Sequence, residues 1–136
     1  MSEILYYKII LHNIMKTRKK MKLENTVEKM LEMLMYIKIY HWKTSSYATH
    51  KATDKLYALL NEHMDKFVEI YLGKQSKDVP LVANFSAKFL NEKKFISKTK
   101  SFIRHLEGLH MDEDLISVRD DLVGDLNQFL YLLSFK

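Results

Sequence analysis

The sequence predicts an all-α protein of one domain, and three observations predict it. Apolar residues recur at intervals of three and four along most of the chain, the spacing that places them on one face of a helix. The 136 residues include 3 Gly and 1 Pro, too few turn-forming residues for a fold of many short strands. A chain of this length is also sufficient for one hydrophobic core.

The first long helix is predicted from Asn25 to about Trp42. Asn25 and Glu28 have the spacing of a capping box, with Asn25 as the N-cap. The apolar positions that follow are Val27, Met30, Leu31, Leu34 and Ile37. Residues 1–22 are therefore interpreted as a leader with a basic segment, and residues 23–136 as the helical domain. The leader is also compatible with an extra helix or with an oligomer contact.

The second helix is predicted from Tyr47 to Leu72, after a short polar connection. Gly73 is the expected C-cap, because glycine readily adopts the left-handed conformation that commonly ends helices. Its apolar stripe consists of Leu56, Leu60, Met64, Phe67 and Tyr71. A polar link ends at Pro80, and residues 81–90 are expected to form a short helix within the connection to the next long element.

Two more long helices complete the prediction. One covers roughly Glu92 to Leu109, and the last begins at Met111-Asp112, where acidic residues suit the positive end of a helix dipole. The last helix has a long stripe made of Leu115, Val118, Leu122, Leu126, Phe129, Leu130 and Leu133. Two helices, a longer connection and two further helices predict a ferritin-like four-helix bundle with a crossover between the second and third helices.

Composition excludes several kinds of chemistry. With no Cys, the chain has no disulfide, no thiolate zinc site and no cysteine nucleophile. No glycine pair has the spacing of a phosphate-binding loop. The apolar stretch at residues 4–15 is shorter than the roughly 20 residues that span a bilayer, so we expect a cytoplasmic protein without stable membrane insertion. The formal net charge of +5 permits an acidic partner without identifying one.

Imidazole and carboxylate side chains gather on one edge of the predicted bundle. At 100° per residue, the second helix places a group of possible metal ligands beside its apolar stripe: His50, Asp54, Asp65 and Glu69. His41 ends the first helix on its inward stripe. Such nitrogen and oxygen ligands suit iron, manganese or zinc. The alternative is a solvated polar face beside the core.

The spacing of these residues constrains how they bind a metal. Asp54 and Asp65 are separated by about 16 Å along a helix, too far to share one ion. A second copy, packed antiparallel about a two-fold axis, would bring the two halves together and create two identical sites per dimer.

The same residues resemble a known signature. The motifs His41-Trp42, His50-x-x-x-Asp54 and Asp65-x-x-x-Glu69 resemble the ferroxidase signature of Dps proteins, the DNA-protecting miniferritins. The last helix is similar as well, through Ser117-x-x-Asp120 and Asp125-Leu126-x-x-Phe129-Leu130-Tyr131. The resemblance covers roughly residues 26–73 and 112–135.

The resemblance implies a site shared between two-fold related subunits. Asp65 and Glu69 of one chain and His41 of its partner would hold the first ferrous ion. His50 and Asp54 of the partner would support a second, weaker site, with Glu69 able to bridge. Zinc or manganese are possible substitutes for iron.

The resemblance also implies an activity and an assembly. Fe(II) would be oxidised by hydrogen peroxide or O2, with Trp42 as an electron donor or radical sink. Ferric mineral would be stored in a homo-oligomer built on two-fold dimers, possibly a dodecamer, and nucleic acid would be protected. The connection from His41 to His50 is shorter than the family's usual pattern and lacks its glycine, which could displace either histidine.

Two further groups are candidates for interaction. Asp121 and Asp125 would line pores that admit ferrous ions. The basic run would contact DNA through phosphates, independently of sequence, or would serve only as a solubilising tail; its residues are Lys16, Arg18, Lys19, Lys20 and Lys22. DNA binding would make the protein nucleoid-associated.

Two other functional readings remain open. One is a Dps-like nucleic-acid-packaging or virion structural protein with weak or no ferroxidase activity. The other is a helical interaction module with a polar edge.

Overall fold

The computed structural model describes residues 1–75 and 79–135, except the side chains of residues 18–22. Its elements are α1 (Glu3–Lys43), α2 (Tyr47–Lys74), α3 (Glu92–Glu107) and α4 (Glu113–Leu133). No strand occurs within the described ranges, which confirms the all-α prediction. In those ranges no helix combines the length and apolarity needed to cross a membrane.

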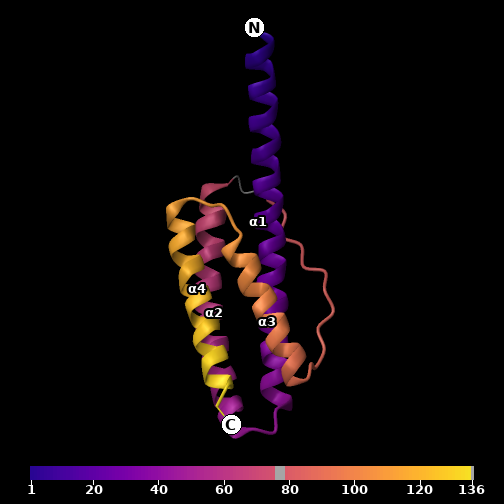
Figure 1. Ribbon diagram of the computed structural model, residues 1–136, viewed down its shortest axis with the longest axis vertical. Helices are drawn as coiled ribbons and strands as arrows, with labels where there is room; N and C mark the ends of the chain where they lie inside the picture. Colours follow the sequence, from indigo (N-terminus) through magenta and orange to yellow (C-terminus); the bar gives the residue numbers. More distant parts are fainter. Residues whose placement is uncertain (76–78, 136) are drawn as a thin grey trace.

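The four helices pack around a shared core (Figure 1). Helix α1 contacts α2 and α3, and α4 contacts the same two helices. Following the chain in Figure 1, α1 and α4 run down, whereas α2 and α3 run up, so every pair in contact is antiparallel. The centre is filled by side chains with no exposed surface: Ile37, Leu60, Phe67, Tyr71, Phe95, Leu106, Leu122 and Leu126.

Helix α1 starts far earlier than predicted. The expected N-terminus at Asn25 is wrong, because α1 is continuous from Glu3 and its N-cap is Ser2, whose hydroxyl accepts from the amide of Leu5 at 3.2 Å. No Gly or Pro occurs before position 73, so no residue in this stretch breaks the helix. A capping box needs a non-helical N-cap, and Asn25 lies within the helix.

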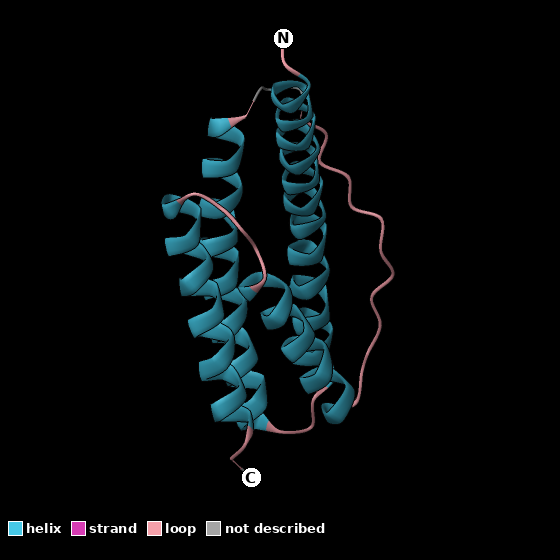
Figure 2. Ribbon diagram, turned by 45° about the horizontal axis from the view of Figure 1, so that its top comes forward, coloured by secondary structure: helices cyan, strands magenta, loops and turns pink. Residues whose placement is uncertain are grey.

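The connection between α2 and α3 is not helical where a short helix was expected. Residues 79–91 run in an irregular, extended path down the outside of α1, so the predicted helix over 81–90 is wrong (Figures 1 and 2). The connection must return along much of the bundle. Ten residues span about 15 Å as a helix and about 33 Å when extended, which favours the extended path.

Aromatic contacts hold this connection against α1. The Tyr40 ring stacks on Phe89 with 5.8 Å between centroids. Tyr36 donates from its hydroxyl to the carbonyl of Ser86 at 3.4 Å. The connection therefore packs on the bundle although it lacks regular structure.

The remaining helix ends are close to prediction, with one correction. Gly73 is inside α2, whose C-cap is Gln75, and the described glycines have no positive φ. The prediction of Gly73 as C-cap is therefore wrong. Helix α3 begins after its N-cap Asn91, which accepts from the Lys94 amide at 2.9 Å. Asp112 is the N-cap position of α4.

Candidate metal centre

His41 and His50 face each other across the turn between α1 and α2. Their rings stack with 3.8 Å between centroids and 18° between planes. Each ring binds the other residue's backbone: His41 Nδ1 lies 2.9 Å from the His50 carbonyl, and His50 Nδ1 lies 2.9 Å from the His41 carbonyl. A carbonyl only accepts, so both Nδ1 atoms act as donors.

These hydrogen bonds leave Nε2 as the ring nitrogen that could bind a metal. A neutral imidazole with its proton on Nδ1 has its lone pair on Nε2. Metal-binding histidines commonly donate their other ring N–H to a backbone carbonyl in this way. Both rings are half-buried, so each keeps access from outside. The pair is thus fixed in the tautomer that ligation requires.

The turn between the helices explains why the rings stay in place. Ser46 is the N-cap of α2 and accepts from the Thr49 amide at 3.2 Å, while the Ser46 amide donates to Thr44 at 3.2 Å. The fully buried Thr53 hydroxyl lies 3.0 Å from His41 Nδ1. Local capping and one buried hydroxyl therefore fix the orientation of the pair.

The stacking limits how the pair could share an ion. A lone pair on Nε2 lies in the plane of its ring, so two nearly parallel rings cannot both point at one ion. If the pair binds metal, each imidazole would therefore hold a separate ion.

The predicted carboxylates lie on the outside of α2. Asp54, Asp65 and Glu69 are exposed. Among the side chains that the structure describes, no three His, Asp or Glu residues are grouped closely enough to hold a metal. One chain therefore brings together His41 and His50, but it does not bring Asp65 and Glu69 to them.

Trp42 extends the surface beside the histidine pair. Its side chain is 68% exposed, and Lys38 Nζ lies 5.9 Å from the Trp42 ring and 4.4 Å from the Tyr57 ring. Leu31 and Met35 are exposed at helical spacing on the same side of α1 as Lys38 and Trp42. The sequence analysis did not predict the contacts of Lys38 with the rings of Trp42 and Tyr57. The position of Lys38 one helical turn before Trp42 could have indicated the first of these contacts.

The pore candidates have different environments. Asp121 is exposed. Asp125 instead contacts α2, because its Oδ2 lies 2.6 Å from His63 Nδ1, and the two side chains are 15% and 22% exposed. No local sequence signal links positions 63 and 125. Asp125 thus connects α4 to α2 within one chain.

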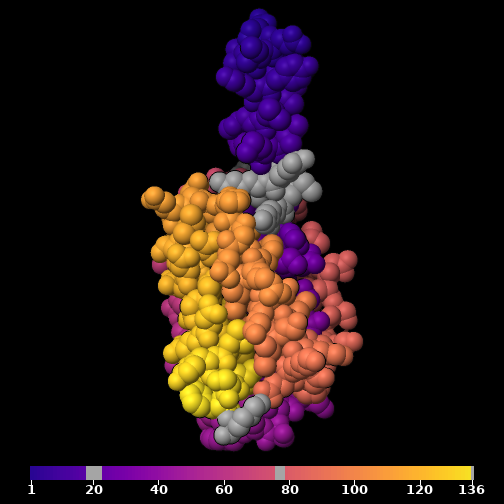
Figure 3. All heavy atoms as spheres, viewed as in Figure 1, coloured from indigo at the N-terminus to yellow at the C-terminus, as the bar shows by residue number. Residues whose placement is uncertain are grey.

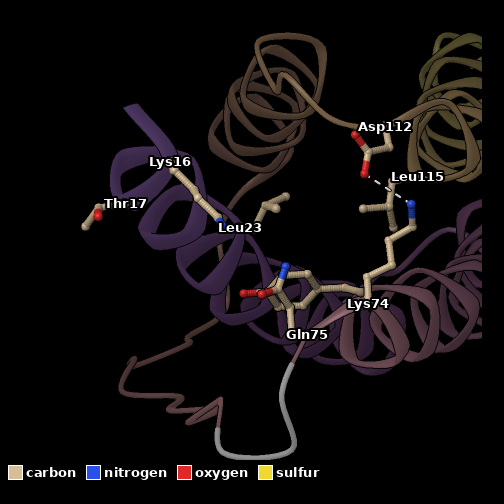
Figure 4. Close-up of a pocket in the computed structure, with 8 residues that line it drawn as sticks. Lys16, Thr17, Leu23, Lys74, Gln75, Asp112 and Leu115 are labelled. Atoms are coloured by element: carbon tan, nitrogen blue, oxygen red, sulfur yellow. Dashed lines mark hydrogen bonds and ion pairs between the residues drawn. The ribbon is translucent and has the colours of Figure 1, made fainter. Parts of the chain in front are cut away.

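A hollow of about 580 Å³ lies at the end of the bundle where α1 emerges (Figure 4). Its lining residues are Lys16, Thr17, Leu23, Tyr71, Lys74, Gln75, Asp112 and Leu115. Lys74 lies 3.0 Å from Asp114 and 3.1 Å from Asp112, and these hydrogen bonds raise the pKa of its ammonium group. Of the predicted basic contacts, Lys16 lies on this hollow, whereas the side chains of Arg18, Lys19, Lys20 and Lys22 are outside the described part of the chain.

The fold and its contacts define an all-helical protein whose turn between α1 and α2 holds a stacked pair of histidines, His41 and His50. The chain belongs to the DUF5856 family of unknown function, which matches residues 41–133. The match begins at His41 and includes every predicted metal ligand. The chain is also 32% identical over 111 residues to an uncharacterized 14.6 kDa protein from the mobD-ri intergenic region of Enterobacteria phage T4, covering 78% of this chain and 86% of that protein. No solved structure matches the chain.

Proposed function

We propose that this protein is a Dps-like miniferritin that oxidises Fe(II) at sites shared between two chains. The observation that carries the proposal is the stacked pair of His41 and His50, with both Nδ1 atoms donating to carbonyls and both Nε2 atoms left for metal. The exposed carboxylates of Asp65 and Glu69 supply the complementary ligands. The resemblance of the ligand order to the Dps signature supports the same assignment.

The helix arrangement supports a ferritin-like bundle. All helix pairs in contact are antiparallel, and the long connection between α2 and α3 returns along the outside of α1 (Figure 1). That order, with one crossover between two antiparallel helix pairs, is the topology of ferritin-like bundles.

A second copy completes the proposed site. Asp65 and Glu69 lie about 22 Å or more along α2 from His50, so a two-fold partner would have to bring its own α2 alongside in the opposite direction. The exposed residues beside the pair, Leu31, Met35 and Trp42, give this dimer an apolar contact surface. Such a dimer is the building unit of a larger homo-oligomer.

In the proposed reaction, iron is the substrate. Two Fe(II) ions each give one electron to hydrogen peroxide, and the O–O bond breaks. The two oxygen atoms are released as water or stay bound to the ferric product as hydroxide. His41 and His50 each bind one ion through Nε2, and the carboxylates of the partner chain neutralise the added charge. The Thr53 hydroxyl keeps the His41 ring oriented. When an oxidising equivalent remains at the site, Trp42 would supply the electron that reduces it.

The test is an anaerobic Fe(II) titration followed by peroxide, read as ferric absorbance. We expect rapid oxidation by the wild type and a rate equal to protein-free iron for Asp65→Ala with Glu69→Ala. The control, Glu113→Ala with Asp120→Ala, removes two carboxylates from α4 and should oxidise iron at the wild-type rate. Equal rates for the wild type and the Asp65/Glu69 variant would refute the ferroxidase function.

A second candidate function is nucleic-acid packaging or a virion structural role with weak or no ferroxidase activity. The observation that favours it is the free N-terminal part of α1, which leads into the basic run at residues 16–22, and the phage relative is compatible with it. A gel-shift assay should then show retarded DNA that is released by salt and by removal of residues 16–22. DNA retardation that persists without these residues would refute this mode of binding.

A further inference from the structure

The N-terminal part of α1 stands free of the bundle. The start of α1 projects beyond the other helices (Figures 1 and 3). Residues 3–17 have a helical length of about 22 Å. We call this segment the arm. All of its residues are exposed except Ile10, which is half-buried. A helical segment of about 15 residues without tertiary packing gains little stability in water, so a partner surface would stabilise the arm.

The arm has an apolar stripe that suits another helix. Ile4, Tyr7, Leu11 and Ile14 follow one another at steps of three and four, and they are 70%, 57%, 58% and 43% exposed. This spacing places them on one face. Lys8, His12 and Asn13 lie away from that face. The stripe is therefore the surface that a partner would cover.

We infer that the arms of two copies pair antiparallel through this stripe. In that register Ile4 lies opposite Ile14 of the second copy, and Tyr7 lies opposite its Leu11. A parallel pair would instead place the two helix N-termini, which carry partial positive charge, side by side, which is unfavourable.

The hollow at the root of the arm gives the tip a place to bind. When Ile4 lies opposite Ile14, Met1 reaches the level of Thr17, which lines the hollow together with Lys16 (Figure 4). Met1 is 87% exposed, and the hollow offers the apolar side chains of Leu23 and Leu115. A two-fold axis through the middle of the arms therefore buries each tip at the partner's bundle.

Arm pairing uses a different surface from the proposed metal site. The metal site needs the outer faces of α1 and α2 near His41, at the far end of α1 from the arm (Figure 1). The two contacts can exist in one assembly, with arms joining neighbouring dimers. Loss of arm pairing would therefore leave the proposed metal-site contact intact, and loss of the metal-site contact would leave arm pairing intact.

Disulfide cross-linking tests the pairing and its direction, because the chain has no Cys of its own. The full chain would be made as two single variants, Ile4→Cys and Ile14→Cys. We expect mild oxidation of the mixture to give a covalent dimer of the two variants, and each variant alone to remain uncross-linked. Efficient cross-linking of Ile4→Cys with itself, or none in the mixture, would overturn the proposal.

Sedimentation gives an independent measurement that does not use cysteine. Leu11→Lys places a charge on the stripe and should reduce the mass of the assembly to that of the unit without arm contacts, while leaving the thermal midpoint of the bundle unchanged. Asn13→Lys adds the same charge on the other side of the arm and should leave the mass unchanged. An unchanged mass for Leu11→Lys would contradict arm pairing, and so would binding of the wild-type arm to anionic lipid vesicles with no self-association.

Discussion

Replacing Tyr71 by Phe should stabilise this protein, because the Tyr71 hydroxyl is buried and has no hydrogen-bond partner among the described residues. The side chain has no exposed surface, and no described group forms a hydrogen bond with its hydroxyl. A buried polar group left unpaired costs about 1–3 kcal/mol. Phe keeps the ring in the core and removes only the oxygen, so the free energy of unfolding should rise by about 1 kcal/mol or more.

Chemical and thermal unfolding, followed by circular dichroism, measure this change. For a chain of this size, about 1 kcal/mol corresponds to a midpoint shift of about 3–5 °C. The matched control is Tyr36→Phe, because the Tyr36 hydroxyl donates to the Ser86 carbonyl. That variant should lose about 0.5–1.5 kcal/mol. Destabilisation of Tyr71→Phe by as much as the control would refute the reasoning and show that the hydroxyl has a partner.

Alkaline pH provides a second readout of the same residue. Burial, followed by the negative charge of Glu24, raises the pKa of Tyr71 above its ordinary value near 10. The folded state then holds this proton at pH values where the unfolded chain has released it, so stability falls as pH rises above 10. Tyr71→Phe removes this contribution, and its stability should decline less steeply than that of the wild type over the same alkaline range.

Three other changes test the packing. Leu122→Ala, in the centre of α4, should lower the free energy of unfolding by about 2–5 kcal/mol in denaturant titration. In a double-mutant cycle of His63→Gln and Asp125→Asn, we expect a coupling of about 1.5–3 kcal/mol, and a coupling near zero would show that their contact contributes nothing. Phe89→Ala should cost about 1 kcal/mol by removing the ring that stacks on Tyr40, and amide exchange should increase along residues 79–91. Unchanged exchange there would mean that other contacts hold the connection.

The sequence predicted the helices where the apolar period is uninterrupted. The start of α2 at Tyr47 and of α3 at Glu92 are as predicted, and the all-α class is confirmed. The errors occur where a short sequence motif predicts one structure and the longer chain around it adopts another. Asn25 is a residue type that commonly caps helices, but no Gly or Pro precedes it, so the helix continues through this position. Residues 81–90 have apolar residues, but the distance they must cover excludes a helix. The ferritin-like bundle stays a prediction.

Ligand types could be predicted from the sequence, but their orientation could not. The motif identifies His41 and His50 as candidates, whereas the direction of each ring depends on a carbonyl nine residues away and on Thr53. Contacts such as His63 with Asp125 and Thr26 with His105 join different helices, so no periodicity reveals them. The shared site, the pores and the DNA contacts stay predictions.

The short turn between α1 and α2 brings His41 and His50 into contact. A connection shorter than the Dps pattern could have displaced either histidine. Instead, it brings the two helix ends close enough for each ring to bind the other residue's carbonyl, which a longer and looser turn would not enforce. The pair is therefore held in one orientation, and less conformational freedom would be lost if it binds an ion as proposed. Lengthening the turn by inserting glycines after Thr44 should consequently weaken Fe(II) binding in a calorimetric titration, while equal affinity would show that the stacked geometry does not prepare the site.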